Sequence, residues 1–305
     1  MAERAIWMDG SLVKWDEAKI HVLTHGLHYG TAVFEGIRCY KTRSGHAVFR
    51  LPDHIQRLMD SGKIYFMDLG YSKSQLQDAV IDTIKANDIG ECYVRPIAYY
   101  GYGKMGVNPL PNKVSIAIAV WKWDEYLKED KTGNGVRLMV SNWNRIDSRS
   151  MPMLAKATAN YANSALARVE ALKAGFDEAI MLNVSGMVVE ASAENIFIVR
   201  DSSLITPPIT SGALDGITRN SILTLAGEHN IPYEVRDIPR DELYLADELF
   251  LTGTAAEVKP VGEVDNRMIG DGKIGIITKR LEALFEAAVH GNDRKFSGIW
   301  LMPID

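Results

Sequence analysis

One short segment of the sequence has the residue types of a phosphate-binding site. In LDGITR, Gly216 ends a turn, Ile217 begins a predicted helix, and Thr218 adds a hydroxyl group to its first turn. The first backbone amides of a helix have no partner inside the helix and point toward an approaching anion. The segment is therefore suited to a single phosphate group, although a plain helix start after a loop would show the same pattern.

A second segment, GTAAE at 253–257, follows directly on the predicted strand ELFLT. Its small residues leave the backbone amides of Thr254 and Ala255 open to a carboxylate. A tight turn without a ligand would have the same composition.

Two charged residues stand where a structural role does not explain them. Lys156 lies among small residues at the start of a predicted helix, and Glu190 ends the short strand MVVE. A cation is disfavoured at the N-terminus of a helix, so this position favours the neutral amine that Schiff-base chemistry requires. Because the chain has 34 basic residues, the pattern alone only suggests this role.

Two other motifs resemble known sites without meeting their requirements. Gly101, Gly103 and Gly106 spell the dinucleotide fingerprint, but the proline-rich segment VNPLP follows, where that motif needs a helix. His25 and His28 are three residues apart, yet no HExxH motif or Cys/His cluster supplies further metal ligands. We expect a loop at the glycines, structural roles for the histidines, and no metal site.

The elements around these residues are predicted in both halves of the chain. Asp9-Gly10 is a favoured hairpin turn, Pro52 opens a helix, and Ser72 or Ser74 caps a second one. Further helices are expected over 156–174, 217–230 and 274–290, and a four-strand meander over 177–207. Strands and helices do not alternate regularly, which predicts an α+β fold rather than a doubly wound parallel sheet.

Composition excludes several classes of protein. The chain has 305 residues, 47% of them hydrophobic, and a formal net charge of −5 with no long run of Lys or Arg. Disorder and a basic nucleic-acid face are therefore not expected. Cys39 and Cys92 are too few for a disulfide framework, and the most apolar run, 114–121, has only the length of a strand. With no secretory signal pattern at the N-terminus, we expect a cytoplasmic protein with no membrane partner.

Several motifs together resemble a known family. HGLHYGTAVFEGIRCY, HIQRL, YVRP, KMGVNP, SNWNRI, AKATANYANS, EASAENIF, ALDGITR and YLADELFLTGTAAE stand in the order found in branched-chain amino-acid aminotransferases. These are class IV, fold-type IV enzymes that depend on pyridoxal 5'-phosphate. The resemblance runs from about residue 7 to about residue 290. It implies transamination of leucine, isoleucine and valine with 2-oxoglutarate by a ping-pong mechanism.

The resemblance assigns cofactor-binding roles residue by residue. Lys156 is implied to hold the cofactor covalently and to shuttle the substrate proton, and Glu190 to pair with the pyridine nitrogen. Tyr161 is implied to bind the ring hydroxyl and Arg57 the phosphate. The remaining cofactor contacts implied are Leu214, Gly216, Ile217, Thr218 and Thr254.

The substrate residues follow from the same resemblance. One pocket must accept both an apolar branched side chain and the second carboxylate of glutamate. Arg95 is implied to meet that second carboxylate, and Tyr93, with the amides of Thr254 and Ala255, the α-carboxylate. The pocket walls implied, partly from a neighbouring subunit, are Tyr29, Phe34, Gly36, Val107 and Tyr126.

The implied architecture is a two-domain fold of the D-amino-acid-aminotransferase type, with the active site between the domains. We place the domains at 1–123 and 136–305 and the linker at 124–135. The resemblance also implies a homo-oligomer, at least a dimer and in some relatives a hexamer. Thr158-Ala159 replaces the paired glycines that often follow the lysine in bacterial relatives, which crowds the helix start without removing a catalytic group.

Two alternatives share these features. D-amino-acid aminotransferases, (R)-amine transaminases and aminodeoxychorismate lyases use the same cofactor residues, but they are not expected to combine YVRP with KMGVNP. A catalytically silent cofactor-binding protein is the alternative from a different class. The retention of Lys156, Glu190, Tyr161 and Arg57 argues against it.

Overall fold

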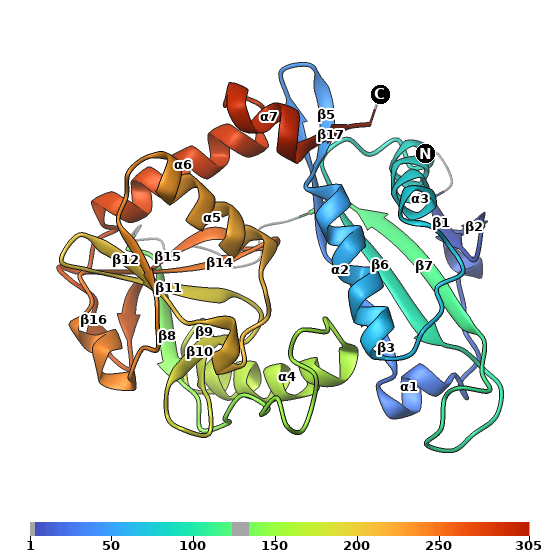
Figure 1. Ribbon diagram of the computed structural model, residues 1–305, viewed down its shortest axis with the longest axis horizontal. Coiled ribbons are helices and arrows are strands. Elements are labelled where there is room, and N and C mark those ends of the chain that lie inside the picture. The colour runs from blue at the N-terminus through green and yellow to red at the C-terminus, as the bar shows by residue number, and fades with distance from the viewer. Residues whose placement is uncertain (1–3, 124–133, 305) are drawn as a thin grey trace. The chain divides into compact units, whose positions relative to one another are not determined.

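The computed structural model describes residues 4–123 and 134–304 (Figure 1). Its described residues form two compact units, which are treated separately below. The first consists of 4–123, 155–159 and 287–304, and the second of 134–154 and 160–286. Each unit has one large sheet together with helices, as an α+β fold requires. Residues 124–133 of the proposed linker lie outside the described residues.

The first unit is built on an antiparallel sheet with the strand order β17-β5-β4-β6-β7-β1-β2, and β3 also pairs with β6. Its elements are β1 (Ala5–Met8), β2 (Ser11–Lys14), η1 (Trp15–Glu17), α1 (His25–Tyr29), β3 (Ala32–Phe34), β4 (Ile37–Thr42), β5 (Gly45–Phe49), α2 (Leu51–Ile64), α3 (Lys73–Ala86), β6 (Cys92–Tyr100), β7 (Val114–Trp121), α7 (Arg294–Trp300) and β17 (Leu301–Pro303).

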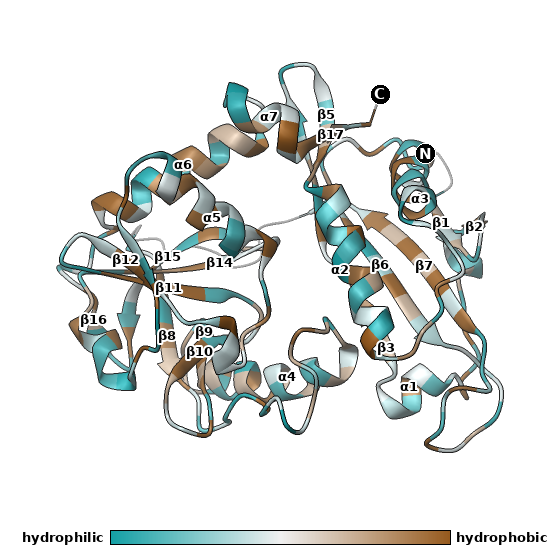
Figure 2. Ribbon diagram, viewed as in Figure 1, coloured by the Kyte–Doolittle hydropathy of each residue, from teal (hydrophilic) through white to brown (hydrophobic). Residues whose placement is uncertain are grey.

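The local signals in the first unit are confirmed. The β1–β2 hairpin turns at Asp9 and Gly10, both with positive φ, and Pro52 lies in the first turn of α2. Ser72 rather than Ser74 caps α3, in a reciprocal capping box with Gln75. Figure 2 shows hydrophobic residues along β7, where alternate positions are buried. These side chains pack with those of α2 and α3 in the core of this unit.

The glycine-rich segment after β6 forms no helix, which confirms the loop prediction. Residues 101–113, all of them described, consist of bends and turns up to the start of β7. Asn112 closes the base of this loop, because its side chain accepts from Lys104 N at 2.7 Å and donates to Lys104 O at 3.1 Å. Gly101 N also donates to Lys113 O at 2.8 Å. This segment therefore offers no helix N-terminus to a dinucleotide.

Two segments that the sequence placed in the C-terminal domain belong to the first unit. β17 pairs with β5, so the end of the chain returns to the sheet of this unit. Ala155 and Ala157 are buried in the core of this unit. Lys156, between them, therefore also belongs to the first unit. These are contacts between segments far apart in the chain, and local patterns do not report them.

The second unit contains a mixed sheet with the order β10-β9-β8-β15-β14-β11-β12-β13, with β16 pairing with β15. The pairs β9–β8, β8–β15 and β12–β13 are parallel. Its elements are β8 (Val136–Val140), α4 (Thr158–Lys173), β9 (Glu178–Leu182), β10 (Val188–Ala191), β11 (Asn195–Arg200), β12 (Ser203–Thr206), η2 (Ile209–Ser211), α5 (Ile217–Glu228), β13 (Tyr233–Val235), η3 (Arg240–Leu245), β14 (Glu248–Gly253), β15 (Glu257–Val264), β16 (Arg267–Met268) and α6 (Ile276–Val289).

Four strands, β9 to β12, lie in the segment predicted as a meander, but the meander itself is wrong. β10 pairs with β9 at one edge of the sheet, whereas β11 pairs with β12 and β14. α5 begins at Ile217 as predicted. The central strand β15 was not anticipated, because its sequence EVKPVGEV contains both Pro260 and Gly262. A Cβ on Gly262 would lie 2.3 Å from the carbonyl oxygen of Asn134, so a side chain there would not fit.

Candidate active site

Lys156 lies two residues before α4, on a backbone that is fixed from both sides. Its carbonyl oxygen accepts from Phe34 N at 2.9 Å, and its amide donates to Ser61 Oγ at 3.0 Å. Its neighbours Ala155 and Ala157 are buried, whereas Lys156 itself is half-buried. Its Nζ lies 5.1 Å from the centre of the Phe34 ring. The fold thus fixes the backbone of Lys156.

Glu35, the residue after Phe34, lies in a buried cluster with His54 and Arg57 that the sequence did not suggest. Glu35 is fully buried and accepts two hydrogen bonds from Arg57, at 2.6 Å from Nε and 2.9 Å from Nη2. His54 Nδ1 lies 2.8 Å from Glu35 Oε2. Arg57, the predicted phosphate ligand, is therefore held in a fixed orientation by Glu35.

The protonation of this cluster follows from burial and charge. Burial raises the pKa of Glu35, but the charges and hydrogen bonds of Arg57 and His54 outweigh burial and bring it below its ordinary value of 4.5. Burial also lowers the pKa of His54, more than Glu35 raises it. Burial thus disfavours the charged form of His54, while its Nδ1 lies within hydrogen-bond distance of the ionised Glu35.

Glu35→Gln should destabilise the protein, since it leaves Arg57 without its buried counter-charge. We expect a loss of about 3 kcal/mol, which is roughly 6 °C or more in Tm. A depressed carboxylate pKa contributes stability above pH 4.5 that is lost as pH falls below it. The difference in Tm between wild type and Glu35→Gln, measured by calorimetry, should therefore narrow on acidification. A constant difference down to about pH 3 would contradict this account, and Glu17→Gln, at an exposed position, is the control.

Arg95 projects from β6 into a group of aromatic rings. Its guanidinium carbon lies 4.9, 5.4 and 5.9 Å from the ring centres of Phe34, Tyr93 and Trp121. Its buried Nε has no hydrogen-bond partner among the described residues. A buried donor of this kind is expected to find an acceptor, and a substrate carboxylate would supply one.

Gly36 is required by the packing of Tyr93. A Cβ at this position would lie 2.0 Å from Tyr93 Oη, so any side chain would displace the tyrosine. Tyr93 in turn stacks on Trp123, with ring centres 4.3 Å apart. Of the predicted wall residues, Tyr29 and Val107 are exposed, at 42% and 81%. Tyr126 lies outside the described residues.

In the second unit, Glu190 is held by three donors at the end of β10. Its Oε1 lies 2.8 Å from Nη2 of the buried Arg145. Its Oε2 accepts from Leu214 N at 3.0 Å and from Asn195 Nδ2 at 3.3 Å. The ion pair favours the ionised carboxylate, which is the form that binds a protonated pyridine nitrogen. Arg145 belongs to SNWNRI and Asn195 to EASAENIF, but neither was singled out from the sequence.

Asn195 also determines which residue can begin α5. Its Nδ2 donates to Leu214 O at 3.0 Å, in the loop that leads into the helix. A Cβ on Gly216 would lie 1.8 Å from Asn195 Oδ1, so only glycine fits there. Gly216 is the N-cap of α5 and offers no side-chain cap, while Thr218 is buried in the first turn, with 3% of its surface exposed. This geometry agrees with a site for an anion at the helix start.

The predicted site residues are divided between the two units. The first unit holds Tyr29, Phe34, Gly36, Arg57, Tyr93, Arg95, Val107 and Lys156. The second unit holds Tyr161, Glu190, Leu214, Gly216, Ile217, Thr218, Thr254 and Ala255. Tyr161 lies in the first turns of α4, and Thr254 and Ala255 form the turn between β14 and β15.

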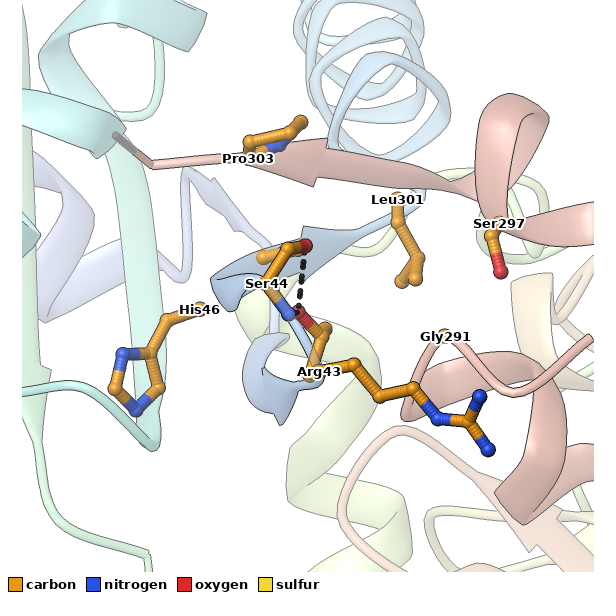
Figure 3. A pocket seen from close by; sticks show the side chains of 9 residues that line it. Arg43, Ser44, His46, Gly291, Ser297, Leu301 and Pro303 are labelled. Carbon is orange, nitrogen blue, oxygen red and sulfur yellow. Dashed lines mark hydrogen bonds between the residues drawn. The ribbon is translucent and has the colours of Figure 1, made fainter.

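A separate cavity of about 340 Å³ lies beside the β4–β5 turn of the first unit (Figure 3). Arg43, Ser44 and His46 line it together with residues of α7 and β17. Its lining includes none of the predicted cofactor or substrate residues that the structure describes. Among the residues described, no cluster of His, Cys, Asp or Glu could hold a metal ion, and no helix is long and apolar enough to cross a membrane.

Comparison with known proteins identifies the family. Residues 32–264 match the family described as Amino-transferase class IV. This chain belongs to that family. The chain is 44% identical over 301 residues to the branched-chain-amino-acid aminotransferase of Salmonella typhimurium, covering 98% of this chain and 97% of that protein. It is 45% identical over 281 residues to the enzyme of that name from Escherichia coli strain K12, covering 92% and 91% of the two chains.

The fold of this class IV aminotransferase agrees with that of a solved relative. The branched-chain amino acid aminotransferase from Thermobaculum terrenum, in its PLP-form, aligns over 100% of this chain and 99% of its own, with a TM-score of 0.93 and 36% identity. The sequence-based assignment to class IV, fold-type IV enzymes is therefore confirmed.

Proposed function

We propose that this chain transfers the amino group of branched-chain L-amino acids to 2-oxoglutarate, with pyridoxal 5'-phosphate as cofactor. The observation that carries the proposal is its similarity, over nearly the whole chain, to enzymes named for branched-chain amino-acid transamination. The cofactor is supported by the relative from Thermobaculum terrenum, whose structure is that of the PLP-form.

The side chains present fit this cofactor. Bound pyridoxal phosphate supplies an electron sink for the carbanion that forms when the substrate loses its Cα proton. Lys156 Nζ would bind the cofactor aldehyde and afterwards move that proton. Glu190, ionised by Arg145, would keep the pyridine nitrogen protonated, and Tyr161 would orient the ring through its hydroxyl. Arg57 and the start of α5 at Gly216 would bind the phosphate.

The substrate residues are proposed on the same basis. Phe34 and Tyr93 would form apolar walls around the branched side chain, with Tyr29, Val107 and Tyr126 completing them. Thr254 and Ala255 amides would bind the α-carboxylate, as the turn between β14 and β15 is composed of small residues. Leu214 would pack on the ring of the cofactor.

Arg95→Ala should separate the two kinds of substrate. A charge-assisted hydrogen bond contributes about 1.5–3 kcal/mol, so KM for glutamate and 2-oxoglutarate should rise by about 30-fold. KM for leucine should change by less than about threefold, because its side chain does not need the cation. Steady-state kinetics with each substrate measure this. Equal losses for all three would show that Arg95 is structural, and Arg43→Ala, at an exposed arginine of the same unit, is the control.

We also propose that the chain forms at least a homodimer, with a hexamer as the larger assembly. Several large apolar side chains on or near α1 and on the 101–113 loop are exposed, which supports a partner surface there. They include Val22, Leu27, Val107 and Leu110, whose exposed fractions are 67%, 63%, 81% and 63%. Light scattering on the purified protein at several concentrations tests this. A monomer at micromolar concentration would contradict it.

A screen of amino donors tests the proposed reaction against its relatives. The purified protein is supplied with 2-oxoglutarate and, in turn, L-leucine, D-alanine and (R)-1-phenylethylamine, and glutamate formation is measured. L-Leucine should be the best donor. Preference for the D-amino acid or the amine would assign the chain to another class IV activity, and absence of activity with all three would favour a silent cofactor-binding protein.

A further inference from the structure

We propose that His25 is a positioning residue for substrate specificity. It holds the 101–113 loop in a fixed position relative to Tyr29 of α1. This inference rests on the proposed function, because Tyr29 and Val107 are proposed walls of the substrate site. It concerns the first histidine of the HGLHYG motif, to which the proposed function gives no part. Both histidines of the motif lie in α1, so they can be compared directly.

The His25 imidazole is fully buried and bonded at both nitrogens. Nδ1 lies 2.7 Å from Thr31 Oγ1, and Nε2 lies 2.7 Å from the carbonyl oxygen of Gly106. A carbonyl oxygen can only accept, so the proton is on Nε2 and the Thr31 hydroxyl donates to Nδ1 when the ring is neutral. The two bonds fix the tautomer and the plane of the ring.

His25 binds the loop at two points. In addition to the bond from its ring to Gly106, its backbone amide donates to Gly101 O at 3.2 Å, at the beginning of the loop. Gly106 has φ of +129°, a backbone conformation that other residues rarely adopt. Asn112 closes the base of the loop independently. The tip therefore depends on His25.

The same imidazole supports Tyr29. The centres of the two rings lie 4.6 Å apart, since residues four apart share one face of a helix. Val107 directly follows Gly106, so the two proposed wall residues are joined through one buried side chain. Val107 is 81% exposed in the single chain, so contacts within the chain do not fix its position. Without the His25 bond, its position would be averaged over many loop conformations, and the cost of ordering the loop would be added to substrate binding.

Two substitutions of His25 distinguish the contributions of its two ring nitrogens. His25→Gln retains a donor near the position of Nε2, whereas His25→Asn retains a polar group only near Nδ1. We expect His25→Asn to raise KM for leucine by about tenfold, the effect of one lost hydrogen bond, with kcat and the Kd for pyridoxal phosphate within about twofold of wild type. His25→Gln should restore most of the wild-type KM. His28→Asn is the control, because His28 is exposed and its ring bonds to Val22 O, at 2.8 Å.

Hydrogen exchange of the loop amides gives a readout that does not depend on activity. Residues 102–111 should exchange faster in His25→Asn than in wild type, His25→Gln or His28→Asn. Gly106→Ala disturbs the same bond from the loop side, because alanine rarely adopts the φ of +129° found there, although no atom lies within 4 Å of the added Cβ. It should reproduce both effects even if His25→Asn does not fold.

The outcomes distinguish the inference from the proposed function. Wild-type exchange and leucine KM in Gly106→Ala or His25→Asn would overturn the inference. So would a loss of cofactor affinity as large as the loss in KM, because that would indicate a general structural role. If wild type itself does not react with leucine, the proposed function fails, while the exchange data still decide whether His25 holds the loop.

Discussion

Lys156→Ala should abolish transamination while leaving the fold intact. The bonds that hold this segment come from the backbone of Lys156, to Phe34 N and Ser61 Oγ, and do not require its side chain. Removal of the amine takes away both the covalent attachment of the cofactor and the group that moves the Cα proton. We expect kcat to fall by about 10⁴-fold or more. The absorbance band of the lysine-bound cofactor should be lost, while the circular dichroism spectrum is unchanged.

Lys156→Arg is the matched variant, since it retains the positive charge and most of the length of the side chain. It should be as inactive as Lys156→Ala, because a guanidinium does not form the required bond with an aldehyde. Retention of turnover and of the absorbance band in either variant would show that another amine holds the cofactor.

Gly216→Ala should weaken cofactor binding far more than its size suggests. The backbone at Gly216 has φ of −73° and ψ of 128°, which alanine adopts without strain. The added methyl group would instead lie 1.8 Å from Asn195 Oδ1, and Asn195 would have to move. Its bonds to Glu190 and to Leu214 O would be lost together. We expect Kd for pyridoxal phosphate to rise by about 100-fold, as two disturbed buried hydrogen bonds would produce.

Gly227→Ala, near the end of the same helix, is the control for Gly216→Ala. An added Cβ there would lie 3.7 Å from the Tyr233 ring, an ordinary contact. Alanine is favoured over glycine within a helix by about 1 kcal/mol, so this variant should be slightly stabilised with Kd within about twofold of wild type. Fluorescence titration of both apo-proteins measures the difference. Equal Kd values for the two variants would refute the role assigned to Asn195.

The features that depend on a few consecutive residues could be predicted from the sequence. The turn at Asp9-Gly10, the cap at Ser72 and the start of α5 at Gly216 each depend on a few consecutive residues. The loop after Gly101 was predicted for the same reason, since the prolines that follow exclude a helix.

Local sequence patterns did not predict the features that depend on contacts between distant segments. Glu35 is separated by 19 residues from His54 and by 22 from Arg57, and nothing in the pattern FEG marks a buried carboxylate. The spacing of His54 and Arg57, three residues apart on one face of α2, was the available signal. Arg145 was likewise recognisable only through its ion pair with Glu190.

The domain boundaries show the same limit. The sequence placed Lys156 with Glu190 because both follow the predicted linker. In the structure, residues 155–159 cluster with the first unit, where the Lys156 backbone is bonded to Phe34 and Ser61.

The most direct test of the account is a half-reaction followed by cofactor absorbance. Purified protein loaded with pyridoxal phosphate is mixed with L-leucine in the absence of any oxo acid. The absorbance of the lysine-bound cofactor should disappear with one equivalent of 2-oxo acid formed per site, and 2-oxoglutarate should restore it. Persistence of the band with L-leucine, or its bleaching only by a D-amino acid or an (R)-amine, would contradict the assignment to branched-chain L-amino acids.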